Sequence, residues 1–147
     1  MISRKSLEPL TIHPLGLVLY AMGFLSLIIG GLFLTPLLSL LFDTSEVIYA
    51  RFFLIPGLTA LAAGGFVIFL FRGSRLELNP RNGSMIVVLA WILASLLAVY
   101  PVRRLAGLNF TQGFFESVSG WTTTGLSVID VSAVPKMLLL WRSIMQL

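Results

Sequence analysis

The sequence contains no cysteine and only one histidine in 147 residues. The lack of cysteine excludes disulfides and thiolate metal sites. The single histidine, His13, gives little support to a histidine-based metal site or to a serine–histidine catalytic pair. Charged residues are also scarce, at 11% of the chain against about a quarter in a soluble domain. Hydrophobic residues make up 57% of the chain, which therefore lacks the polar surface of a water-soluble globule.

Three long stretches have no Asp, Glu, Lys or Arg: between Glu8 and Asp43, from Phe52 to Phe71, and from Asn82 to Val102. A bilayer core of roughly 30 Å needs about 20 apolar residues in a helix, and each stretch supplies them. We therefore expect three membrane-spanning helices. The first stretch has no small-residue cleavage site, which favours a retained helix over a signal peptide.

The predicted spanning helices cover about His13–Leu41, Val47–Phe71 and Ser84–Val102. Within them, we expect Pro36 to kink the first helix near its outer end and Pro101 to close the third. The segment between the second and third helices carries Asn-Pro and Asn-Gly pairs, which predict a polar turn.

Glycine recurs every seven residues in the first predicted helix, at Gly16, Gly23 and Gly30. This spacing puts small residues on nearly one face, which lets membrane helices approach closely. A neutral interpretation, that membrane helices simply tolerate glycine, stays open. The adjacent Gly64 and Gly65 in the second helix favour a close neighbour there.

The net charge of +4 is spread thinly, so it indicates membrane topology and not nucleic-acid binding. Five cations lie before the first helix or between the second and third: Arg4, Lys5, Arg72, Arg75 and Arg81. By the positive-inside rule, the N-terminus and the loop at 72–83 are cytoplasmic. The bias is incomplete, because Arg51, Arg103, Arg104 and Lys136 fall at or near the outer side.

After the third helix the chain stays apolar and aromatic but is too interrupted to span a bilayer. Asn109 can cap a helix over 110–120, with Gln112 as its box partner. This helix runs into the threonine-rich segment 122–127. A short apolar helix after a spanning one is typical of a re-entrant segment. Irregular backbone at membrane depth must be buried by protein or line a water-filled path, so we expect 122–127 to line such a path.

A further apolar helix is predicted over 134–147, and its roughly 21 Å length is short of the bilayer core. We therefore expect it to be truncated. Arg142 lies at depth in this helix, and its partner is expected in sequence beyond this chain. Glu116, in the re-entrant helix, is either a functional carboxylate or a structural partner for a backbone or arginine group. We favour the structural role.

The order of helix, re-entrant helix, Thr/Gly segment and helix is the plan of a cation-channel pore repeat. Such a pore replaces the water shell of potassium with backbone carbonyl oxygens. Gly125 permits the unusual backbone angles that turn carbonyls inward. The negative end of the short helix dipole would favour a dehydrated cation. Taken alone, a Thr-Thr-Thr-Gly run after a helix is more typical of a capping turn.

The fourteen residues from Phe114 to Ser127, Phe-Phe-Glu-Ser-Val-Ser-Gly-Trp-Thr-Thr-Thr-Gly-Leu-Ser, resemble the first filter of the Trk/Ktr/HKT superfamily. Within the superfamily, they resemble the bacterial TrkH-type potassium uptake proteins in particular. The flanks at 81–100 and 135–143 resemble the two helices of that repeat. The resemblance implies an all-α membrane fold: two N-terminal helices, residues 1–83, followed by one helix–pore-helix–filter–helix repeat (M1-P-M2), residues 84–147.

In that family, four repeats surround a pore, and potassium is bound just before and at the filter glycine. The resemblance implies Thr123 and Thr124 as the main ligands, with Thr122, Gly125 and Leu126 adjoining. Glycine at position 125 goes with potassium in the family, and serine there goes with sodium. The family uses no organic cofactor; its cargo is K⁺.

The resemblance also implies the bacterial inner membrane, potassium symport, a homodimer and a TrkA-like cytoplasmic nucleotide-binding regulatory subunit. Two other classes were weighed. A membrane enzyme has little support, because the serines at Ser117 and Ser119 lack the leading glycine of a nucleophile turn. A non-conducting fragment or accessory membrane subunit that packs with other transporter chains stays open.

Overall fold

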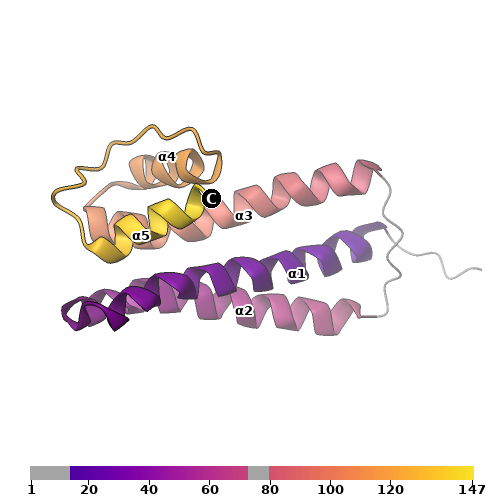
Figure 1. Cartoon of the computed structure of the whole chain (residues 1–147). Helices are drawn as coiled ribbons and strands as arrows, with labels where there is room; N and C mark the ends of the chain where they lie inside the picture. Colours follow the sequence, from indigo (N-terminus) through magenta and orange to yellow (C-terminus); the bar gives the residue numbers. More distant parts are fainter. Residues whose placement is uncertain (1–13, 73–79) are drawn as a thin grey trace, which may run out of the picture.

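The computed structural model describes residues 14–72 and 80–147 (Figure 1). Within these ranges the chain forms helices and no strand. They are α1 (Pro14–Leu34), the 3₁₀ segments η1 (Thr35–Leu41) and η2 (Thr44–Tyr49), α2 (Arg51–Phe71), α3 (Pro80–Ala106), α4 (Phe110–Trp121) and α5 (Lys136–Met145). His13, the cations Arg4, Lys5 and Arg75, and most of the predicted loop at 72–83 lie outside the described residues.

Three helices are long and apolar enough to cross a membrane: Leu15–Leu41, Arg51–Phe71 and Asn82–Ala106. They lie side by side along most of their length (Figure 1). This confirms the prediction of an all-α, multi-pass membrane chain with three spanning helices.

Helices α1 and α2 form an antiparallel pair whose closest approach is made by glycines. A Cβ on Gly23 would lie 3.0 Å from the carbonyl oxygen of Gly64, and one on Gly30 would lie 2.9 Å from that of Gly57. The glycine spacing in α1 therefore serves close packing at these two positions, and the neutral interpretation is not needed there.

We predict that Gly64→Ala destabilises the α1–α2 pair, whereas Gly65→Ala does not. The new methyl group at position 64 would lie 2.7 Å from the Gly23 carbonyl oxygen, and at position 65 it would meet nothing within 4 Å. Overpacking of this kind costs about 1–3 kcal/mol. Thermal unfolding in mild detergent measures the difference, with Gly65→Ala as the matched control. Equal stability of the two variants would contradict the packing account.

The first spanning segment changes from α-helix to 3₁₀-helix before Pro36, where the sequence predicted only a kink. Proline has no N–H to donate to Leu32, four residues earlier, and its ring crowds that carbonyl. The Thr35 hydroxyl donates to the Leu32 carbonyl instead, at 2.6 Å. A tighter 3₁₀ helix follows, with Pro36 buried.

Two predictions about α3 are wrong. Pro80 was placed in a turn, but it is the first residue of α3, where its missing N–H costs nothing. Pro101 was expected to close the helix, but α3 continues past it to Ala106. The helix ends instead at Gly107, which has φ +67°, and the Leu108 N–H donates to the Arg103 carbonyl at 3.2 Å.

Helix α5 is buried against the rest of the chain through Trp141, which has no exposed surface. Its ring centroid lies 4.3 Å from that of Phe33 in α1, 5.9 Å from Phe53 in α2 and 5.9 Å from Trp121 at the end of α4. This aromatic cluster joins the N-terminal helix pair to the last two helices. The packing fixes where the segment between α4 and α5 lies.

Candidate functional site

Helix α4 folds back along the second half of α3 (Figure 1). The predicted capping box starts it: the Asn109 side chain accepts from the Gln112 N–H at 2.9 Å, and the Gln112 side chain accepts from the Asn109 N–H at 3.1 Å. Near its start, a Cβ on Gly113 would lie 2.5 Å from the Arg103 side chain. At its end, Trp121 lines an apolar cavity of about 240 Å³ with Ala94, the middle of the third span.

The threonine run caps the end of α4. The Thr123 N–H donates to the Gly120 carbonyl and the Thr124 N–H donates to the Ser119 carbonyl, each at 3.1 Å. These two bonds are those of a Schellman motif, with Thr123 in the left-handed position at φ +54°. The capping-turn interpretation is therefore correct for these residues. Glycine normally occupies this position, and a β-branched residue there is strained, which is characteristic of functional sites.

The sign of φ alternates across the next residues. It is positive at Thr123, negative at Thr124 and positive again, +77°, at Gly125. These three residues are exposed, and space around Gly125 is open. On the flank, the Thr122 hydroxyl donates to the Val118 carbonyl at 2.8 Å and lies 2.7 Å from the Thr124 hydroxyl. Hydrogen bonds to α4 and the Thr122 side chain thus lie on one side of the backbone of 123–125, and its other side is exposed.

The segment after Gly125 is fastened to α4 by side chains. The Ser119 hydroxyl donates to the Leu126 carbonyl at 2.6 Å, and the Val128 N–H donates to the carboxylate of Glu116. The Leu126 carbonyl is thereby partly engaged, unlike those of Thr123 and Thr124, for which the structure shows no hydrogen bond. The hydrogen bonds fix the position of the chain as it leaves the exposed segment.

Glu116 and Arg142 form a buried ion pair between α4 and α5. Their nearest oxygen and nitrogen lie 3.3 Å apart, and their side chains are 1% and 13% exposed. Arg142 also donates to the Ser127 hydroxyl at 2.9 Å. The structural role favoured for Glu116 is supported, since it accepts a hydrogen bond from a backbone N–H and forms an ion pair with an arginine. The expectation that the partner of Arg142 lies beyond this chain is wrong, because α5 packs back on α4.

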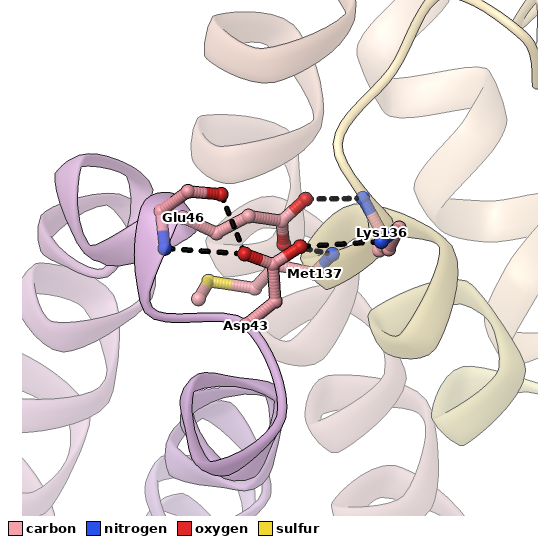
Figure 2. Close-up of polar contacts among 5 residues, drawn as sticks. Asp43, Glu46, Lys136 and Met137 are labelled. Atoms are coloured by element: carbon pink, nitrogen blue, oxygen red, sulfur yellow. Dashed lines mark hydrogen bonds and ion pairs between the residues drawn. The ribbon is translucent and has the colours of Figure 1, made fainter.

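Two acidic residues between α1 and α2, Asp43 and Glu46, bind the start of α5 (Figure 2), a contact that the sequence analysis did not predict. The Glu46 carboxylate accepts the Lys136 N–H through one oxygen and the Met137 N–H through the other, both at 2.8 Å. The Lys136 ammonium lies 3.2 Å from Asp43. The one available signal was Pro135, which precedes α5 and offers no capping side chain.

Asp43 also caps η2. Its carboxylate accepts from the Ser45 hydroxyl and from the Ser45 N–H at 3.2 Å. The Ser45 hydroxyl, followed by Lys136, holds the pKa of Asp43 below its usual range. Asp130 has a similar turn, in which the Ser132 hydroxyl lowers the pKa of its carboxyl group. Both carboxylates therefore stay charged at pH values where an isolated aspartate begins to protonate.

Among the described residues, no cluster of three or more His, Cys, Asp or Glu side chains could hold a metal ion. The cation ligands that the described site can offer are the backbone and hydroxyl oxygens of 122–126. Fold and site together define a membrane protein in which a short helix ends at a Thr-Thr-Thr-Gly segment whose last three residues are exposed.

The chain belongs to the TrkH family, described as "Cation transport protein", which matches residues 50–147. It is 34% identical to the Trk system potassium uptake protein TrkG of Escherichia coli K12 over 86% of this chain and 26% of the relative. It is 32% identical to an uncharacterized cation transporter of Methanocaldococcus jannaschii, over 88% of this chain and 27% of the relative. It is 30% identical to the Trk system potassium uptake protein TrkH of Escherichia coli K12, over 84% and 26%.

The chain therefore spans about a quarter of the length of these relatives. The family confirms the resemblance stated from residues 114–127. It is a family of transport proteins and not of enzymes, as the sequence predicted.

Proposed function

We propose that the chain forms the first pore repeat of a TrkH-type potassium uptake protein, with residues 122–126 as its ion-binding segment. The similarity to relatives named potassium uptake proteins supports potassium as the cargo. Residues 84–147 form the repeat, with α3 and α5 as its flanking helices and α4 as its pore helix. Residues 1–83 form the preceding helix pair and cytoplasmic loop.

The position of α4 is the observation that carries this proposal. Its last residue, Trp121, lines the same apolar cavity as Ala94, which lies at the middle of the third span. The end of a helix carries roughly half a negative charge. At mid-membrane, where water is scarce, that charge favours a cation, and the open backbone of 123–125 begins there.

The alternating backbone of Thr123, Thr124 and Gly125 supplies the ligands in this proposal. Alternation in the sign of φ can turn successive N–H groups toward one side. The carbonyl groups then gather on the other side, where they can replace the water shell of K⁺. Thr123 and Thr124 are the main ligands, with Thr122 and Gly125 adjoining. Leu126 contributes less freely, because its carbonyl already accepts the Ser119 hydroxyl.

The orientation and partners follow from the same proposal. Arg72 lies at the end of the helix pair where α1 begins and α2 ends, whereas Asp43 lies at the opposite end. The positive-inside rule then favours a cytoplasmic N-terminus. The bacterial inner membrane is the location that we propose for the chain. Three further repeats would complete the pore. A TrkA-like regulatory subunit, a homodimer and symport belong to the whole transporter.

Complementation tests the proposal. We expect the chain, together with any continuation that its gene encodes, to restore growth of a potassium-uptake-deficient bacterium at low potassium. Rescue by the chain alone would mean that copies assemble around one pore. Rescue only with a continuation would mean that the repeats share one polypeptide. If neither form restores growth although the protein reaches the membrane, the chain is a non-conducting accessory subunit and the proposal is wrong.

A further inference from the structure

Glu46 lies far from residues 122–126 in the sequence, yet it binds the first turn of α5, the helix that contacts the residues on either side of them. It is 8% exposed, and each of its carboxylate oxygens accepts one backbone N–H from the first turn of α5 (Figure 2). The first N–H groups of a helix have no partner within the helix, and the helix dipole places partial positive charge there. A buried carboxylate that takes two of them fixes both the position and the direction of α5.

Helix α5 in turn supports the end of α4 and the segment that follows it. A Cβ on Gly120 would lie 3.3 Å from the Met145 Cβ, so the two helices touch there. The Trp121 and Trp141 rings meet at 5.9 Å. Arg142 donates to Ser127 at 2.9 Å. A shift of α5 would therefore move the residues on both sides of 122–126.

We propose that Glu46 is a positioning residue for the ion-binding segment: by capping α5, it holds the helix that contacts Gly120, Trp121 and Ser127, which lie on either side of that segment. The inference rests on the proposed function of that segment. It gives the N-terminal part of the chain a role in ion selection.

The neighbouring ion pair between Asp43 and Lys136 does not share this role. Its side chains are 33% and 77% exposed, and exposed ion pairs contribute little to stability. Removal of the Lys136 ammonium leaves the backbone N–H for Glu46 in place. Removal of the Glu46 carboxylate leaves the N–H groups of Lys136 and Met137 without their acceptors, and the second of these hydrogen bonds is buried.

Because this chain has no native cysteine, a disulfide between two introduced cysteines can be measured without competing thiols in the chain. In a Gly120→Cys/Met145→Cys chain, the two Cβ atoms lie close enough for a disulfide when α5 is docked on α4. We expect Glu46→Ala to slow oxidative cross-linking about tenfold, because two charge-assisted hydrogen bonds are lost. Lys136→Gln, the matched control, should cross-link at the parent rate. Equal rates for Glu46→Ala and the parent would overturn the proposal.

A second measurement separates positioning from general stability. In transporting cells, we expect Glu46→Ala to lower the ratio of K⁺ to Na⁺ uptake, with Glu46→Gln intermediate because it keeps one acceptor oxygen. A merely structural role would lower the amount of protein and leave the ratio unchanged, which would overturn the inference. If Glu46→Ala does not reach the membrane, the uptake ratio is measured with Glu46→Gln instead, and a ratio equal to that of the parent would overturn the inference. If the parent transports no cation, the proposed function fails, whereas the cross-linking result still decides whether Glu46 holds α5.

Discussion

Replacement of Glu116 by alanine is expected to destabilise the chain by about 3–5 kcal/mol, the usual cost of leaving one member of a buried ion pair alone. Arg142 would keep its charge at a site where its side chain is 13% exposed, with the Ser127 hydroxyl as its remaining partner. The Val128 N–H would lose its acceptor as well. This single change therefore removes two contacts that hold the segment after Gly125.

A double-mutant cycle in mild detergent measures this effect. Arg142→Leu in the Glu116→Ala background should recover part of the lost stability, because the unpaired charge is gone. Ser119→Ala is the neighbouring control: it removes the hydrogen bond to Leu126 and should cost only about 1 kcal/mol. Ordinary surface substitutions change the free energy of unfolding by up to about 0.5 kcal/mol. If Glu116→Ala lowers the free energy of unfolding by no more than this, the ion pair does not stabilise the site.

Replacement of Gly125 by serine is expected to reduce the preference for potassium over sodium by roughly tenfold. The glycine has φ +77°, and a side chain in that left-handed region costs about 1–2 kcal/mol. Relief of that strain would turn the peptide planes that carry the proposed ligand oxygens of Thr123 and Thr124. A loss of about 1.4 kcal/mol in the binding of one ion over the other corresponds to the tenfold change.

Gly107 offers a matched control for this experiment. It also has positive φ, at +67°, and like Gly125 it has open space where a Cβ would stand. Gly107→Ser therefore brings the same backbone strain at the end of α3, away from residues 122–126. Uptake of K⁺ and Na⁺ in complemented cells should show a changed ratio for Gly125→Ser alone. An equal shift in both variants, or in neither, would contradict the assignment of Gly125 to an ion-binding segment.

Features that depend on residues close in sequence could be predicted. The capping box of Asn109 and Gln112 needs only two residues three positions apart, and the structure forms it as expected. The spans were visible because a bilayer demands long uncharged runs. The predictions for Pro80 and Pro101 were wrong, because a helix accepts proline at its first position and Pro101 is tolerated within α3.

Contacts between distant segments could not be predicted from the sequence. The hydrogen bonds of Glu46 join residues 90 and 91 positions apart, and no local pattern marks them. The pairing of Arg142 with Glu116 depends on the return of α5 along α4. The left-handed backbone at Thr123 was also hidden, because threonine disfavours that conformation and only the surrounding capping bonds impose it.

The most direct test of the central claim is to locate a heavy potassium substitute in a crystal of the protein assembled with its complete pore. Thallium(I) or rubidium, found by anomalous scattering, would mark where the cation binds. The account predicts a peak in contact with the backbone oxygens of Thr123 and Thr124, which sodium does not reproduce. A cation bound elsewhere in the pore, with residues 122–126 making no contact with it, would contradict the account.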